Sequence, residues 1–321
     1  MSYKIAISQT NYPDSTVERA VIEELDAEIV TGHATSAAEL VDLAAGADAL
    51  LVQSAEVTAG VLDELDELQV ISRYGIGVDN VDVAAATERG VLVTNVPSYC
   101  EEEVATHALS LLLTVARKTA LFNEAVKSET WDWKLGRPIE PLVGKTVGFA
   151  AFGKIPQRLT ELAAGFDFDY LVYDPYLDES DIVGTDVEKV DFDTLLAESD
   201  VISVHAPLVD DTRHMFDADA FQAMRDDAIL INTARGPIVD EDALAEALRN
   251  DKIAGAGLDV MADEPVTESP LFDLDSVAVT PHVAWYSERS LDELRRKAAE
   301  NVARVFKDED PYGVVNEQAL D

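Results

Sequence analysis

The sequence predicts an α/β protein with two Rossmann-like domains, each built on a doubly wound parallel sheet. Three observations support this fold class. The chain has 321 residues, which is enough for two domains of ordinary size. Short β-type runs alternate with amphipathic helical stretches, a pattern typical of parallel sheets that carry helices on both faces. A second series of this kind begins at Gly144, after a long helix and an irregular segment.

The first series predicts one complete domain. We expect strands at residues 4–8, 49–52, 70–73 and 91–94, with amphipathic helical stretches at 17–25 and 37–44. The Pro97-Ser98 pair marks its end, because proline seldom continues a regular element. Residues 1–98 are therefore expected to form a flavodoxin-like, substrate-binding domain, completed by residues 287–321.

A long helix should follow this boundary. Ser98 and Glu101 have the spacing of a capping box, so the helix is expected to run from Glu101 to about Ala120. One face of it is apolar and is expected to be buried between domains or subunits; its residues are Val104, Ala108, Leu111, Leu112 and Val115.

The second series predicts a nucleotide-binding domain over residues 99–286. Six strands are expected in it, at residues 146–151, 170–174, 201–205, 228–232, 257–260 and 277–280. The last helix, 291–306, follows the completed sheet and is expected to cross back to the first domain. The active site is then expected in the cleft between the domains.

The net charge of the chain limits the classes of molecule that it is expected to bind. The chain carries 63 acidic and 24 basic residues, for a net charge of −39, yet 47% of its residues are hydrophobic. A folded protein with an acidic surface is therefore expected, and such a surface repels nucleic acid and anionic membranes. We expect a salt-adapted, halophilic protein, with an ordinary acidic protein as the alternative.

Cysteine use and hydropathy bear on location. Cys100 is the only cysteine, so no disulfide can form within the chain. No apolar run approaches the ~20 residues that span a bilayer, and the N-terminus does not resemble a signal peptide. A cytoplasmic location is expected. No metal site is expected either, because the histidines and Cys100 lack zinc-ligand spacing.

The segment 144–156 reads as strand, turn and helix, where a dinucleotide fingerprint would have three glycines. Ala151, Gly153 and Pro156 stand at those places. Gly153 is the position that lets the backbone approach a pyrophosphate, and Pro156 is tolerated in a first helical turn. Gly153, Lys154 and Ile155 are therefore candidate cofactor-binding residues at a helix N-terminus. Alone, the motif is equally compatible with an ordinary βα turn.

Asp174 ends the next expected strand, about 20 residues further on, where a ribose-binding acid belongs. A 2′-phosphate would meet like charge there, so NAD(H) is favoured, with NADP(H) as the alternative.

Four residues of candidate catalytic chemistry follow expected strands: Arg235, Asp259, Glu264 and His282. An arginine can bind both a carboxylate and a carbonyl, and a histidinium can protonate the oxygen left by hydride transfer. A carboxylate behind the imidazole would stabilise its charged form. Taken singly, each residue has a structural explanation, such as an ion pair, a turn cap or a core histidine. Their order after a nucleotide-binding turn favours catalysis.

With these motifs, the chain resembles the D-isomer-specific 2-hydroxyacid dehydrogenases over essentially its whole length. The segments that carry the resemblance are 75–80, 174–176, 232–240, 258–260 with 264–265, and 281–282. The resemblance implies that Arg235 binds the substrate, Glu264 partners the histidine and His282 donates the proton. It also implies that the Ile76 and Gly77 amides hold the substrate carboxylate and that the product is the D isomer. The implied cofactor contacts are Ala206, Pro207, Thr212, Thr233, Ala234, Arg235, Asp259 and His282.

The chain departs from the family pattern at Ala151 and Pro156, and at His107, where many members carry an acid. Residues 284–287 are most similar to the branch that contains the C-terminal binding proteins. By that likeness Trp285 lines the substrate pocket and favours 2-keto acids with apolar side chains; a tryptophan buried at the domain seam is the alternative.

Two functions follow from these observations. The first is an NAD(P)-dependent reductase that converts 2-keto acids into D-2-hydroxy acids. The alternative is a dinucleotide-sensing regulator with little turnover, but the intact Arg235, Glu264 and His282 set favours the enzyme. A homodimer through the NAD-binding domain is also expected.

Overall fold

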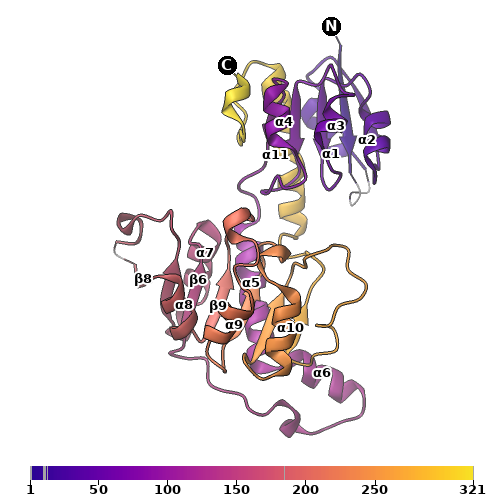
Figure 1. Ribbon diagram of the computed structural model, residues 1–321. Helices are drawn as coiled ribbons and strands as arrows, with labels where there is room; N and C mark the ends of the chain where they lie inside the picture. The colour runs from indigo at the N-terminus through magenta and orange to yellow at the C-terminus, as the bar shows by residue number, and fades with distance from the viewer. Residues whose placement is uncertain (1, 10–11, 13, 184, 321) are drawn as a thin grey trace. The chain divides into compact units, whose positions relative to one another are not determined.

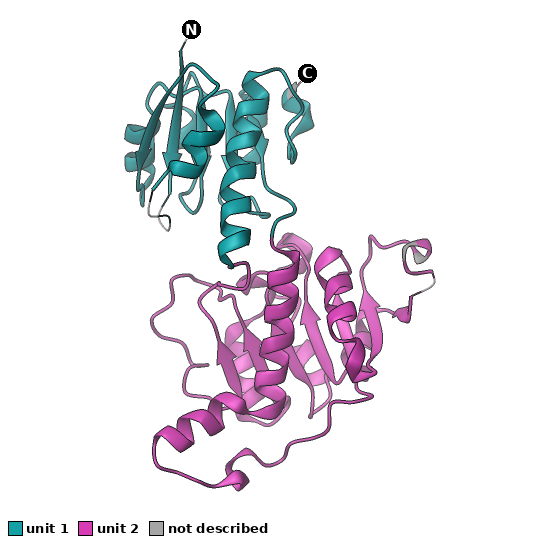
Figure 2. Ribbon diagram, turned by 180° about the vertical axis from the view of Figure 1, so that it is seen from behind, with its two compact units in different colours: residues 1–99, 287–321 teal, residues 100–286 magenta. Residues whose placement is uncertain are grey.

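The computed structural model describes residues 2–9, 12, 14–183 and 185–320 and divides the chain into two compact units. Residues 1–99 and 287–321 form unit 1, and residues 100–286 form unit 2 (Figure 2). In the described part of the chain, no helix is both long and apolar enough to cross a membrane.

Unit 1 is built on a five-stranded parallel sheet (Figure 1). Its strand order, β2-β1-β3-β4-β5, is that of flavodoxin-like folds. The strands are β1 (Tyr3–Ser8), β2 (Ala27–Gly32), β3 (Ala49–Val52), β4 (Val70–Arg73) and β5 (Leu92–Thr94).

Helices cover both faces of this sheet. Three of them share one hydrophobic cluster with the strands: α2 (Ala37–Ala44), α3 (Ala59–Leu62) and α4 (Val83–Glu88). The helices α1 (Thr16–Ile22) and α11 (Glu288–Phe306) pack against each other, and α11 also packs against β4. The last helix therefore belongs to unit 1.

Unit 2 is built on a seven-stranded parallel sheet with the order β12-β11-β10-β9-β6-β7-β8. Six of the strands have the order of a doubly wound dinucleotide-binding domain, and β12 extends it. Its strands are β6 (Thr146–Ala150), β7 (Asp169–Tyr173), β8 (Val187–Lys189), β9 (Val201–Val204), β10 (Ile229–Asn232), β11 (Gly255–Leu258) and β12 (Val277–Val279).

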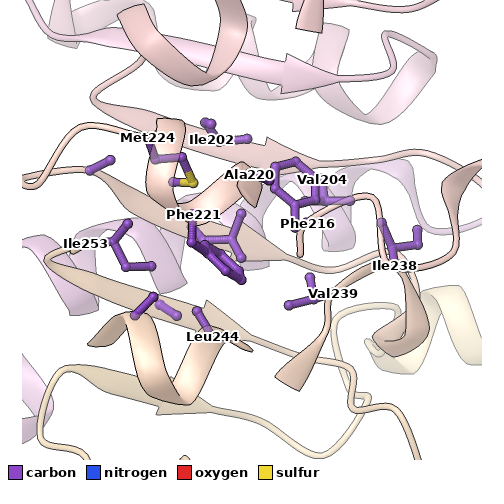
Figure 3. Close-up of a cluster of buried hydrophobic side chains, with 14 of the residues drawn as sticks. Ile202, Val204, Phe216, Ala220, Phe221, Met224, Ile238, Val239, Leu244 and Ile253 are labelled. Carbon is purple, nitrogen blue, oxygen red and sulfur yellow. The ribbon is translucent and has the colours of Figure 1, made fainter. Parts of the chain in front are cut away.

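The two faces of this sheet carry separate cores. On one face, Phe216 and Phe221 pack with Ile202, Val204 and neighbours beneath α8 (Phe192–Glu198), α9 (Ala218–Ala223) and α10 (Glu241–Arg249) (Figure 3). On the other face, α5 (Glu101–Arg117) and α7 (Lys154–Leu162) cover Phe149 and Ile231. The α/β prediction with two doubly wound parallel sheets is confirmed.

Some predicted details were wrong. The N-cap residue of α5 is Cys100 rather than Ser98, and the Cys100 side chain makes no capping hydrogen bond. The helix ends at Arg117 rather than about Ala120, because Lys118 adopts a left-handed conformation before α6 (Thr119–Lys127) begins. The sheet of unit 2 has seven strands where six were expected, and β11 begins two residues before the expected strand.

The apolar face of α5 packs on the sheet of its own unit. Ala108, Leu111, Leu112 and Val115 are buried there among strands of unit 2, whereas burial between domains or subunits was expected. Gly255 and Gly257 of β11 permit this approach, because a Cβ atom at either would lie within 3 Å of Val115 or Leu111.

Candidate active site

Three neighbouring strands of unit 2 bring the catalytic candidates to one edge of the sheet. The strands β10, β11 and β12 are adjacent and parallel, so the loops after their carboxyl ends lie side by side. Arg235 follows β10, Asp259 and Glu264 follow β11, and His282 follows β12. This edge is where ligands bind in open α/β sheets.

Glu264 and His282 form a direct pair. The His282 Nδ1 atom lies 2.7 Å from Glu264 Oε2, and the other carboxylate oxygen accepts the Met261 N–H at 2.9 Å. Burial would raise the pKa of Glu264, but the hydrogen bond and charge of His282, the Met261 N–H and the charge of Arg235 together lower it. Glu264 is therefore ionised at neutral pH, and His282 Nε2 has no hydrogen-bond partner among the residues that the structure describes.

Asp259 anchors the loop that carries His282. It is 1% exposed, and its carboxylate accepts the Thr280 hydroxyl at 2.6 Å and the N–H groups of Val283 and Ala284 at 2.9 and 2.8 Å. Its backbone carbonyl accepts the His282 N–H at 2.7 Å. A single buried carboxylate thus fixes the backbone on both sides of the histidine.

Two other residues of this site were given no role from the sequence, although His107 was noted as a departure from the family pattern. The His107 Nε2 atom of α5 lies 2.9 Å from the Thr280 hydroxyl and 3.5 Å from Asp259. Gly236 is needed because a Cβ atom there would lie 1.9 Å from the Met261 carbonyl, so it lets the loop of Glu264 approach the loop of Arg235. Gly236 lies in the segment 232–240 that carries the family resemblance, but nothing in the sequence showed which part of the backbone would approach it.

The loop after β10 is held by its own side chains. Asn232 is fully buried; its amide donates to the Arg235 carbonyl at 2.9 Å and accepts from the Ala234 N–H at 3.0 Å. The Arg235 guanidinium donates to the Ala234 carbonyl at 2.7 Å. The Thr233 hydroxyl is buried and has no hydrogen-bond partner in the described residues, as would suit a site shaped for a ligand.

The turn between β6 and α7 fits a phosphate group. A Cβ atom at Gly153 would meet nothing within 4 Å, so no protein contact explains the glycine, and open space lies in front of the helix. The N–H groups of Gly153, Lys154 and Ile155 have no backbone partner within the described ranges. Pro156 lies in the first turn of α7, as expected. Lys154 is 4.0 Å from Glu101, which offsets part of its charge.

The remaining cofactor candidates lie on the same edge. Asp174 follows β7, and its two carboxylate oxygens accept the N–H groups of Phe152 and Tyr176 at 3.0 and 2.9 Å. The aspartate is thereby fixed beside the phosphate turn. Thr212 closes the loop after β9 by donating to the Pro207 carbonyl at 2.6 Å, and Ala206 is buried at the start of that loop.

The substrate candidates Ile76 and Gly77 belong to unit 1 and follow β4. The backbone N–H groups of both residues have no hydrogen-bond partner within the described part of unit 1, which suits binding of a carboxylate. The Asn95 side chain fixes this loop by donating to the Ile76 carbonyl at 2.5 Å, and Ile76 itself is exposed.

Trp285 lies in the His282 loop of unit 2. Its indole Nε1–H donates to the His282 carbonyl at 2.9 Å, and its ring meets Tyr286 edge to face. Beside it, Ala284, Tyr286 and the first turns of α5 line a shallow hollow of about 380 Å³.

Comparisons with known proteins show the family to which the chain belongs. Residues 109–284 match the family described as D-isomer specific 2-hydroxyacid dehydrogenase, NAD binding domain. The chain belongs to this family. It is 39% identical over 290 residues to a hydroxypyruvate reductase of Thermotoga maritima, covering 89% of this chain and 92% of that protein.

Other family members extend beyond this chain or share its fold. A D-3-phosphoglycerate dehydrogenase of Methanocaldococcus jannaschii is 37% identical over 299 residues, covering 92% of this chain but 56% of that protein. The chain thus spans about half the length of most of the phosphoglycerate dehydrogenases that it matches. A D-lactate dehydrogenase of Aquifex aeolicus, solved with NAD and lactic acid, superposes with a TM-score of 0.84 at 27% identity, covering 95% of this chain and 96% of that one.

Proposed function

We propose that the chain is a 2-keto acid reductase that makes D-2-hydroxy acids with NAD(H), NADP(H) being the alternative cofactor. The observation that carries the proposal is the pair formed by His282 Nδ1 and Glu264 Oε2 at 2.7 Å, at the carboxyl edge of a dinucleotide-binding sheet. The names of the relatives, hydroxypyruvate reductase among them, support the same chemistry.

In this mechanism His282 is the proton donor. Glu264 accepts the Nδ1–H, which leaves Nε2–H of the imidazolium to protonate the carbonyl oxygen of the keto acid. The negative charge of Glu264 stabilises the imidazolium before transfer and orients the ring. When bound, the nicotinamide supplies the hydride that adds to C2, so one hydride and one proton convert the ketone into the alcohol.

Arg235 and the loop after β4 are proposed to bind the substrate. The guanidinium of Arg235 can contact both the carboxylate and the carbonyl oxygen, which positions C2 and polarises its carbonyl. The N–H groups of Ile76 and Gly77, which have no hydrogen-bond partner among the described residues, are proposed to hold the same carboxylate. Arg235 belongs to unit 2, and the two amides belong to unit 1.

The residues of unit 2 fit a dinucleotide. The α7 N-terminus with Gly153, Lys154 and Ile155 would hold the pyrophosphate, and Asp174 would accept hydrogen bonds from the adenosine ribose hydroxyls. The loops of Ala206, Pro207 and Thr212 and of Thr233 to Arg235, with Asp259, would line the rest of the cofactor site. The carboxylate of Asp174 favours NAD(H) because a 2′-phosphate would meet like charge.

Trp285 is proposed to lie beside the substrate side chain. An aromatic wall there would favour keto acids with apolar side chains, as the likeness to the branch of the C-terminal binding proteins implies. This assignment predicts the substrate class only, not one compound.

The homodimer is proposed to form through the arm of unit 2, residues 117–143. None of the residues of α6 is buried, and the arm exposes five large apolar side chains: Val126, Trp131, Trp133, Leu135 and Val143. The arm carries five bases and four acids, in a chain whose net charge is −39. The arm is therefore nearly neutral, so a second copy of the chain can pack against it with less charge repulsion than an acidic surface would give.

Replacing His282 by alanine tests the function. The wild-type protein should oxidise NADH when a 2-keto acid is added, and His282→Ala should lower kcat by about 10²- to 10⁴-fold, the usual contribution of a general acid. NADH binding, measured by fluorescence titration, should change little, because the nucleotide would be held by other loops.

The matched control is His33→Ala, which removes an exposed histidine of unit 1. It should leave kcat unchanged. Wild-type protein that binds NADH but reduces no 2-keto acid in a broad panel would contradict the proposal and favour a dinucleotide-sensing regulator.

A further inference from the structure

We propose that Trp285 is a positioning residue: its indole N–H holds the backbone of His282 in a left-handed conformation and so aims the imidazole. The inference deepens the proposed function, because it rests on His282 as the proton donor. It differs from the pocket-wall assignment of Trp285, which concerns the face of the ring and not its N–H group.

The backbone of His282 is strained. Its φ is +52°, a region that residues with a Cβ atom rarely adopt. Such strain persists only where the surroundings fix the conformation, and it occurs most often at functional sites. The question is therefore which contacts fix this residue.

Two peptide groups determine the orientation of His282, and both are held. The N–H of His282 donates to the Asp259 carbonyl at 2.7 Å, which fixes the preceding peptide group. In the following peptide group, the Val283 N–H donates to the Asp259 carboxylate at 2.9 Å, and the His282 carbonyl accepts the Trp285 indole N–H at 2.9 Å. Trp285 thus restrains this peptide group at its carbonyl, independently of Asp259, which restrains it at its N–H.

The direction of the imidazole follows from this backbone. Its Nδ1 atom must lie 2.7 Å from Glu264, on a loop that leaves a different strand. A right-handed His282 would carry its Cβ atom in another direction, and the ring would then lose Glu264 or the substrate. The indole N–H and the Glu264 carboxylate therefore hold the histidine at its backbone and at its ring.

Two substitutions separate the N–H group from the ring face. Trp285→Phe keeps an apolar aromatic ring but removes the donor. Trp285→His keeps a five-membered ring with an N–H donor, because histidine Nε2 lies the same number of bonds from Cβ as the indole nitrogen. The substitution removes the fused benzene ring. A positioning role predicts that histidine rescues turnover and phenylalanine does not, whereas a role confined to the pocket wall predicts the reverse.

The kinetic test measures kcat and KM for wild type and both variants with a small and a bulky apolar 2-keto acid. For Trp285→Phe we expect kcat to fall about 10- to 100-fold for both substrates, with each KM within about twofold of wild type. For Trp285→His we expect kcat with the small substrate to exceed that of Trp285→Phe by about tenfold. A Trp285→Phe variant with wild-type kcat, or a Trp285→His variant as impaired as Trp285→Phe, overturns the proposal.

A second measurement does not depend on turnover. In protein labelled with ¹⁵N-histidine, the five imidazoles can be resolved by NMR, and His282→Ala identifies the signal of His282. Wild type and Trp285→His should show one defined tautomer with Nδ1–H bonded to Glu264; Trp285→Phe should show an averaged or broadened signal. An unchanged signal in Trp285→Phe overturns the proposal. If the signal changes as expected but wild type reduces no keto acid, the positioning role stands and the proposed reaction fails.

Discussion

Glu264 is the residue whose ionisation matters most directly to the proposed site. Its pKa is lowered, since the His282 pair, the Met261 N–H and Arg235 together outweigh the effect of burial. A carboxyl group whose folded pKa lies below its unfolded value of about 4.3 stabilises the fold above that value. This stabilisation is lost as the pH falls through the lowered pKa.

Glu264→Gln should therefore lower the melting temperature at pH 7, and the difference from wild type should shrink below about pH 4.3. The measurement is calorimetric melting of both proteins between pH 7 and pH 3. Turnover should also fall at pH 7, because the imidazolium loses its counter-charge.

The control for charge alone is Glu268→Gln, an exposed residue of the same loop. Its difference from wild type should be small and should not follow that pH range. A Glu264→Gln protein that melts like wild type at pH 7 would contradict the interpretation of the pair.

At the scale of single residues, the sequence predicted which candidate side chains lie together. Glu264 and His282 pair as the order of motifs suggested, and Asp259 and Arg235 lie on the neighbouring loops. The support beneath them was not predicted, because it depends on long-range contacts. The Thr280 hydroxyl contacts both Asp259 and His107 of α5. His107 lies 173 residues from Thr280 along the chain, and no local sequence pattern indicates such a contact.

Among the elements, the strands that are buried throughout were predicted, whereas two of the four edge strands, β2 and β8, were not. The predicted β3 and β9 are four-residue strands that are buried throughout and apolar except for Ser203. The missed β2 and β8 lie at the edges of their sheets and are only partly buried, so polar residues interrupt their patterns. Strand β11 was shifted because its two glycines, which make room for α5, are typical of loops in a sequence.

The turn between β6 and α7 carries strain that the sequence pattern explains. Ala151 stands where the fingerprint has glycine, and its φ is +73°. An alanine in this region costs roughly 1–2 kcal/mol, whereas glycine adopts it freely but loses about 0.5–1 kcal/mol through unfolded-state entropy. Ala151→Gly should therefore raise the free energy of unfolding by about 0.5–1 kcal/mol, measured by urea denaturation.

Ala223→Gly, at an exposed position of α9, is the matched control. It makes the same chemical change where φ is not positive and should destabilise the protein by up to about 1 kcal/mol. If both variants were destabilised equally, the positive φ of Ala151 would not be the source of strain.

For the whole molecule, charge is the dominant property. A net charge of −39 on 321 residues makes the folded chain repel itself, and the repulsion is strongest where salt does not screen it. The hydrophobic cores of the two sheets must stabilise the fold against this repulsion. The same charge opposes association of two copies, although the arm of residues 117–143 has five bases and four acids.

Raising KCl should therefore act on folding and association together. Between about 0.1 M and 3 M KCl the Debye length falls from ~10 Å to below ~3 Å, so repulsion between surface carboxylates is largely removed. The melting temperature and keto acid turnover should both rise with KCl, and sedimentation velocity should show the dimer fraction rising in parallel.

Replacing both Trp131 and Trp133 by serine should give a monomer at every salt concentration while the melting temperature still rises with KCl. The double variant thus separates the two effects, since charge screening acts on each unit whereas association needs the exposed apolar arm. Activity and melting temperature that are both highest below physiological salt would contradict salt adaptation, and a double variant that still dimerises would remove the arm from the interface.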